Sequence, residues 1–208
     1  MKQTRLEQLA DGIFAIVMTL LVLNIHVPVL PEPVDNGALL QALKDVIPLL
    51  LSYLLSFSLL FTYWRAHHFT ASVYAKSIDT KFTNINALFL FFVALVPFTS
   101  NLLGLYLSTH VAIFIFALDV VCVGLTLYWM RRYVAVSKTI ENENVSTEED
   151  QHAYTRILFP VFCAVVAVVV SYFNPNLSLF LFTIGILFNL SRRSTRIIFG
   201  FVRPFLRS

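Results

Sequence analysis

Residues 5–24 read RLEQLADGIFAIVMTLLVLN, a short polar head followed by an apolar run from Ile13 to Leu23. A helix that crosses a bilayer needs about 20 mostly apolar residues, and this stretch meets that requirement. Comparable runs recur along the chain, at 6–26, 46–66, 84–106, 111–130, 157–173 and 177–191. The pattern predicts an all-α polytopic membrane protein with six transmembrane helices.

The composition of the 208-residue chain points the same way, with 58% hydrophobic and 13% charged residues. Soluble domains average about 45–50% apolar and 25% charged residues. We find no internal repeat and no soluble domain boundary, and we predict that 1–208 form one six-helix domain. No small-residue cleavage site follows the first apolar run, so we expect that run to stay in the mature protein.

The basic residues divide unequally between the two sides that six spans would create. One side holds Lys44 alone. The other side holds Lys2, Arg5, Arg65, Lys76, Lys81, Arg131, Arg132, Lys138, Arg156, Arg192, Arg193, Arg196, Arg203 and Arg207. Because cations beside spans are retained in the cytoplasm, this asymmetry predicts that both termini are cytoplasmic. The formal net charge of +3 therefore reflects orientation in a lipid bilayer and gives no indication of nucleic-acid binding.

Polar residues at bilayer depth are costly, and they mark functional or bracing positions. The first span contains Asp11, Gly12, Thr19 and Asn24, and the middle of the fourth contains Asp119. Further polar residues stand where the second span ends and the third begins: Trp64, Arg65, His67, His68, Asn84 and Asn86.

Familiar catalytic motifs are absent from the sequence. It contains no HExxH, GxSxG, P-loop or dinucleotide-binding motif, so we predict that the protein is not an enzyme and has no cofactor. Adjacent helical residues such as His67 and His68 point about 100° apart, which disfavours a shared metal ion. We interpret Cys122 and Cys163, both within predicted spans, as apolar thiols and not as metal ligands.

The residues Arg5-Leu6-Glu7-Gln8-Leu9-Ala10-Asp11-Gly12 resemble a known signature, RxxxFSDG, at the start of helix 1. It belongs to the endosomal and lysosomal potassium channel family, transmembrane protein 175, and its bacterial relatives. Arg, Asp and Gly match in spacing, whereas Leu9 replaces Phe and Ala10 replaces Ser. The Ala10 substitution removes any hydrogen bond that the serine hydroxyl makes in relatives.

Three further stretches are similar to this family. IFAIVMTLLVLNI at 13–25 resembles its pore helix, YWRAHHF at 63–69 the end of its second helix, and NALFLFFVALVPFTS at 86–100 its third helix. Animal members carry two six-helix repeats and bacterial ones carry one. The resemblance therefore implies a prokaryotic, single-repeat homotetramer in the plasma membrane, with helix 1 lining a central pore for potassium and other monovalent cations.

One face of helix 1 suits such a pore. At 100° per residue, Leu20 and Leu23 lie within about 40° of Ile16, and Thr19 lies about 60° away. Four copies would form apolar rings at Ile16, Leu20 and Leu23, with a hydroxyl ring at Thr19; the resemblance implies that Ile16 is the narrowest. A dewetted apolar ring stops ions because it cannot replace their hydration shell. Helix 1 is apolar all round, however, so other stripes can also be drawn on it.

Asp11 lies about 140° from Ile16 and therefore points away from the proposed pore. A partly buried carboxylate needs donors. We predict a bracing network that holds helix 1 against the next two spans, made of Arg5, Asp11, Gly12, Trp64, His67, His68 and Asn84.

Three functions are compatible with these predictions, and the third, a non-transporting membrane scaffold or an intramembrane enzyme, is disfavoured as an enzyme because paired catalytic groups are missing. The leading one is a tetrameric, potassium-permeable cation channel with a hydrophobic constriction, because the carbonyl-filter motif TVGYG is missing. The alternative is a proton-coupled secondary transporter that uses Asp119 as its proton site. We favour a bracing role for Asp119, paired with a polar group of the fifth or sixth span.

Overall fold

The computed structural model describes residues 3–26, 28–30, 32, 35–137, 140 and 147–190, with side chains for all of these except 147–153, 188 and 190. The described residues are helical and contain no strand, which confirms the all-α prediction. The elements are α1 Gln3–Leu23, α2 Asn36–Asp45, α3 Ile47–His68, the π-helix η1 Phe69–Tyr74, α4 Thr80–Leu105, α5 His110–Val136, α6 Thr147–Ser171 and α7 Pro175–Leu190.

Five stretches of the described chain are long and apolar enough to cross a membrane, so the protein is multi-pass. They lie at Gln3–Leu23, Ile47–Tyr74, Thr80–Leu105, His110–Val136 and Tyr154–Ser171. The sixth predicted span coincides with α7, whose apolar part, Pro175–Leu187, is shorter. A helix of 16 residues is about 24 Å long, against a hydrocarbon thickness of about 30 Å. The six-span count therefore stays a prediction.

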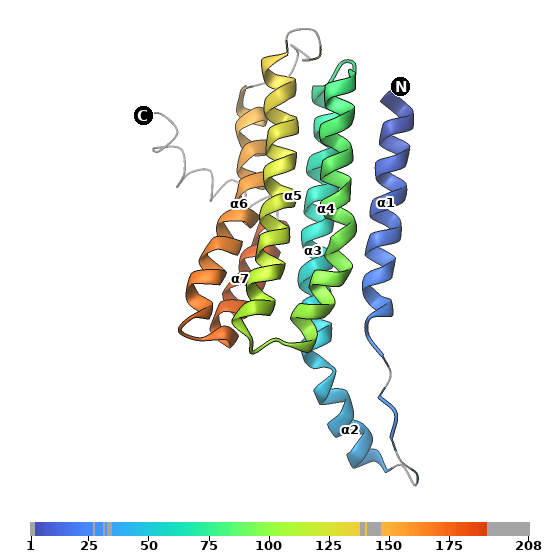
Figure 1. Cartoon of the computed structure of the whole chain (residues 1–208), viewed down its shortest axis with the longest axis vertical. Helices are drawn as coiled ribbons and strands as arrows, with labels where there is room; N and C mark the ends of the chain where they lie inside the picture. The colour runs from blue at the N-terminus through green and yellow to red at the C-terminus, as the bar shows by residue number, and fades with distance from the viewer. Residues whose placement is uncertain are drawn as a thin grey trace.

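The long helices run side by side, with α1 at one edge of the bundle (Figure 1). Among the described elements, helix α1 contacts α3, η1 and α4, whereas α5 lies between α4 and α6 and contacts both extensively. The start of α1 and the end of α5 lie at one end of the bundle, and the α4–α5 and α6–α7 turns lie at the other (Figure 1).

Helix α2 was not anticipated from the proline-rich link that follows the first span. The Asp35 carboxylate caps this helix by accepting a hydrogen bond from the Ala38 main-chain N–H at 2.6 Å. None of its residues is buried, and it projects beyond the bundle (Figure 1). Asp79 caps α4 in the same way through the Phe82 N–H at 2.7 Å, which starts that helix four residues before the predicted position at 84.

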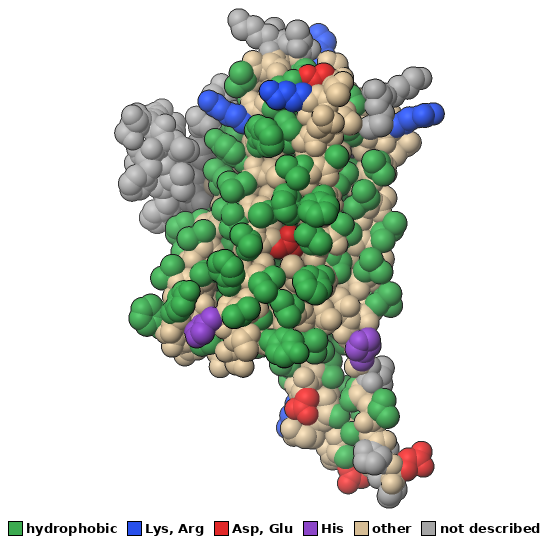
Figure 2. All heavy atoms as spheres, in the orientation of Figure 1, with side chains coloured by type: hydrophobic (Ala, Val, Ile, Leu, Met, Phe, Trp, Pro, Cys, Tyr) green, Lys and Arg blue, Asp and Glu red, His purple; other side chains and the backbone are tan. Residues whose placement is uncertain are grey.

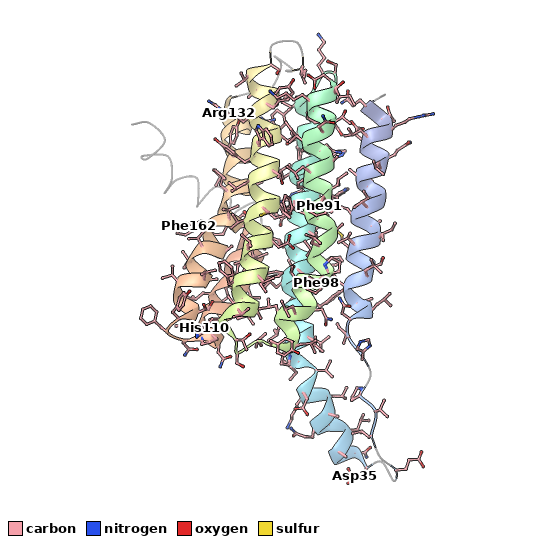
Figure 3. All side chains as sticks on the ribbon, in the orientation of Figure 1. Asp35, Phe91, Phe98, His110, Arg132 and Phe162 are labelled. Carbon is pink, nitrogen blue, oxygen red and sulfur yellow. The ribbon has the colours of Figure 1, made fainter. Side chains whose placement is uncertain are left out.

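Hydrophobic side chains cover the middle of the molecule, and Lys and Arg side chains gather at the end where α1 begins (Figure 2). Arg132 lies at this end, whereas His110 and Asp35 lie toward the other (Figure 3). Large aromatic side chains stay exposed on the sides of the bundle, including Phe91 and Phe98 of α4 and Phe162 of α6. This apolar band is what a chain surrounded by lipid requires.

Candidate functional site

Helix α1 has two apolar faces, one buried and one exposed. One face is buried in the bundle and consists of Leu6, Ala10, Phe14, Val17 and Leu21. The other is open. It carries all four predicted pore residues, with Ile16 60%, Leu20 42% and Leu23 66% exposed, and Thr19 also exposed.

Gly12 lies on the same open face, about 40° from Ile16. A Cβ atom added at Gly12 would meet nothing within 4 Å. A second helix can therefore approach α1 closely at this point without a side chain between the two backbones.

The Thr19 hydroxyl is oriented by its own helix. It lies within hydrogen-bonding distance of two main-chain carbonyl oxygens, that of Ala15 at 3.0 Å and that of Ile16 at 2.8 Å, so its single proton points at the backbone. With the proton directed at the backbone, the lone pairs of the exposed oxygen are left to accept from water or to contact a cation.

Asp11 and Trp64 form the first predicted contact of the bracing network. The Trp64 indole N–H donates to Asp11 Oδ1 at 2.8 Å, which joins α1 to α3. The Trp64 ring also stacks on His68, with centroids 6.1 Å apart. Asp11 is exposed in the single chain, so this bond lies nearer the surface than we expected.

His67 forms the second contact, with Asn86, which was not a predicted member of the network. Its Nε2 lies 2.6 Å from Asn86 Oδ1, and its ring stacks on Phe89 at 5.2 Å and borders Phe14 at 6.3 Å. His67 is only 2% exposed, so this contact joins α1, α3 and α4 at the centre of their interface.

Three predicted members of the network lie outside these contacts, and one of them, Gly12, is on the open face of α1. Asn84 and Arg5 are exposed, and neither has a partner among the residues that the structure describes. Asn84 and Asn86 are about 200° apart on α4, so only one of them can face His67, and that one is Asn86.

Sequence reasoning missed two anchors at the ends of α1. The Gln3 Nε2 donates to the Ala71 carbonyl at 2.6 Å and to the Ala75 carbonyl at 3.2 Å, both in or beside η1. At the other end, Asn24 Nδ2 donates to the Pro97 carbonyl of α4 at 3.1 Å. Asn24 was noticed as a polar residue in an apolar run, whereas nothing in the local pattern marks Gln3.

Comparison with known proteins gives a consistent result. Residues 5–97 match the family described as endosomal/lysosomal potassium channel TMEM175. A crystal structure of a lysosomal potassium-selective channel TMEM175 homologue from Chamaesiphon minutus matches with a TM-score of 0.76 and 28% identity, over 92% of this chain and 97% of that one. These matches support a relationship of the chain to the TMEM175 family.

Two curated proteins that match part of the chain illustrate the range of names. A protein named potassium channel from Streptomyces collinus is 36% identical over 132 residues, which are 60% of this chain and 62% of that protein. The human endosomal/lysosomal proton channel TMEM175 is 33% identical over 102 residues, 47% of this chain and 20% of the human one. The chain thus spans less than two thirds of these curated relatives. Their names describe channels and not enzymes, in agreement with the sequence.

The family-model match, residues 5–97, ends before Asp119, which lies in the middle of α5. Asp119 is 6% exposed, and its Oδ2 lies 2.8 Å from the Thr99 hydroxyl of α4. The expected partner on the fifth or sixth predicted span is therefore replaced by one on α4. The other carboxylate oxygen, Oδ1, has no hydrogen-bond partner among the described residues.

The described residues contain no group of three or more His, Cys, Asp or Glu side chains that could hold a metal ion. Cys122 and Cys163 are free thiols on α5 and α6.

Proposed function

We propose that four copies of the chain form a potassium-permeable cation channel, with α1 of each copy around a shared axis. The open faces of α1 then line the pore, and α3, η1 and α4 support α1 from outside. In this proposal α7 completes six spans, the chain resides in a prokaryotic plasma membrane, and both termini are cytoplasmic. The gathering of Lys and Arg at one end of the bundle supports this orientation.

The observation that carries the proposal is the unequal burial of the two faces of α1. A lipid-facing helix needs only large apolar side chains, but the open face of α1 also bears a glycine and a hydroxyl, Gly12 and Thr19. Small and polar residues favour close helix–helix approach inside a membrane. The names of the family and of the bacterial relatives agree with a channel.

The proposed mechanism needs no carbonyl filter. Rings of Ile16, Leu20 and Leu23 exclude water when they close, and ions then face the full cost of dehydration. When the rings widen and become wet, four Thr19 oxygens next to Ile16 offer partial replacement of the hydration shell. Selectivity then depends on how far an ion must dehydrate to pass Ile16.

Purified protein in planar bilayers tests this function. We expect discrete conductance steps carried by potassium, and crosslinking in mild detergent that proceeds to a tetramer. A largest stable species no greater than a dimer, or flux without discrete steps, would reject the channel.

A second candidate is a proton-coupled transporter that uses Asp119. The buried carboxyl, one oxygen of which has no hydrogen-bond partner among the described residues, favours it, since acids at bilayer depth often carry protons. Liposomes with a potassium gradient and a pH-sensitive dye inside separate the two functions. Coupled transport moves protons and potassium in a fixed ratio, and Asp119→Asn abolishes both; a channel conducts without fixed coupling, and Asp119→Asn leaves its current intact.

A further inference from the structure

The π-helical turn η1 exposes main-chain acceptors in the interior of the bundle. In an α-helix the Ala71 carbonyl would accept from the Ala75 N–H. Here the Ala75 N–H instead reaches back five residues and donates to the Thr70 carbonyl at 3.2 Å. The next N–H, that of Lys76, also turns away and donates to the Ile140 carbonyl at 2.6 Å.

The Gln3 side chain donates to the Ala71 carbonyl in place of these two main-chain N–H groups. Its amide nitrogen lies 2.6 Å from the Ala71 oxygen and 3.2 Å from the Ala75 oxygen. Ala71 is fully buried and Ala75 is 3% exposed. A carbonyl at such a site is costly to leave without a donor, so the change of helical register at η1 creates a specific docking point for one side chain of α1.

The turn η1 is in turn fixed to the opposite side of the bundle. The Arg131 guanidinium of α5 lies 3.0 Å from the centre of the Tyr74 ring, and Arg131 is 2% exposed. Ile140, which follows α5, is 3% exposed and holds the Lys76 N–H. Gln3 therefore links the edge helix α1 to η1, which contacts with Arg131 and Ile140 hold in place.

We propose that Gln3 is a positioning residue that fixes the height and rotation of α1 through η1, and so sets how readily the Ile16 ring opens. The inference rests on the proposed channel function. Apolar contacts along Leu6, Ala10 and Phe14 are non-directional, whereas two hydrogen bonds at the first turn specify one register. Without the two hydrogen bonds from Gln3, the four α1 helices are held less firmly in register, and the ring at Ile16 becomes wet more often.

Gln3→Met tests the proposal, because Met has a similar length and no N–H groups. Gln8→Met is the matched control: Gln8 is on the same helix, exposed and without a partner among the described residues. Single-channel recording should show a closed-to-open ratio about tenfold lower in Gln3→Met than in wild type, with unchanged unitary conductance. Gln8→Met should match wild type.

Three results would overturn the proposal: equal open probability in Gln3→Met and wild type, an equal change in Gln8→Met, or fewer tetramers with unaltered open probability per channel. The last result would leave Gln3 a purely structural role. Hydrogen exchange provides a readout that does not depend on conduction. Amides of 69–76 should exchange roughly tenfold faster in Gln3→Met only. If the wild-type protein conducts no ions, the proposed channel function is rejected. If the amides of 69–76 exchange at equal rates in Gln3→Met and wild type, the positioning role of Gln3 is rejected.

Discussion

Helices α1 and α5 are both long and apolar, yet the bundle holds them in opposite ways. Helix α5 is buried on several sides between α4 and α6, and close packing fixes it. Helix α1 buries a single stripe at the edge, and polar side chains fix its ends and middle: Gln3, Asp11 and Asn24. Two helices of similar hydropathy can therefore be fixed in different ways. Close packing on several sides fixes α5, whereas a few hydrogen bonds fix α1 and leave one of its faces open.

The largest expected effect comes from the glycines of these two helices. A Cβ atom at Gly124 of α5 would overlap the Val161 side chain and lie 2.7 Å from the Tyr63 hydroxyl oxygen. We expect Gly124→Ala to cost about 3 kcal/mol and to lower the yield of folded protein sharply, because overpacking forces neighbours from their positions.

Gly12→Ala of α1 is the comparison, since its Cβ would meet nothing in the single chain. We expect the folded monomer to be unharmed or stabilised by up to about 1 kcal/mol. Thermal melts followed by size-exclusion chromatography measure both variants. Equal losses in the two would contradict the contrast between α1 and α5, and loss of the tetramer alone in Gly12→Ala would sharpen it by locating Gly12 at a subunit interface.

An intermediate effect is expected at the bond between α1 and α3. Asp11→Ala removes the acceptor of the Trp64 N–H, and a hydrogen bond to a charged group contributes about 1.5–3 kcal/mol. Because Asp11 is exposed, we expect a smaller loss than for a buried ion pair. Melting of the tetramer should show it, and Trp64→Phe should produce a similar loss that is not additive with Asp11→Ala. Additive losses would mean that the two residues act separately.

The smallest effect concerns pH at the start of α4, outside the spans. The Phe82 N–H, and after it the Tyr133 hydroxyl, donate to Asp79 and lower the pKa of its carboxyl. Stability from this cap is therefore present above the usual Asp pKa of about 3.9 and is lost as the pH falls through the lowered value. Asp79→Asn keeps a capping oxygen at every pH. The difference in melting temperature between wild type and Asp79→Asn should shrink or reverse only in strong acid; a constant difference would contradict the assignment.

Much of this architecture could be predicted from the sequence. Long apolar runs predicted five stretches that the structure shows as long apolar helices, and the helical period placed Asp11 and Ile16 on different faces of α1. In the structure Asp11 bonds to Trp64 of α3, and Ile16 lies on the open face. Asn84 was predicted in the network, whereas the structure places Asn86 beside His67, because the choice depends on the rotation of α4 against α3. The partner of Asp119 was misjudged for the same reason, since apolar helices carry no signal of which neighbour they contact.

The role of Gln3 was beyond sequence reasoning for a different reason. Its acceptors lie at a π-helical turn, and the N–H of Lys76 just after that turn bonds to Ile140, more than 60 residues away. Helix α2 was not predicted because the prolines at 28–33 indicated an irregular link. The residue that caps α2, Asp35, lies two positions after the last of them.

The most direct test of the account replaces Ile16 with Asn and measures potassium flux from liposomes that hold equal amounts of tetramer. A polar amide at the narrowest ring should hold water, so resting flux should rise roughly tenfold or more. Val22→Asn is the matched control, because Val22 is 48% exposed but about 120° from Ile16; Val17 is unsuitable because it is 4% exposed. We expect potassium to leak through Ile16→Asn and not through Val22→Asn. A leak in Val22→Asn alone, or unchanged flux in both, would contradict the assignment of the Ile16 face of α1 as the barrier to ions.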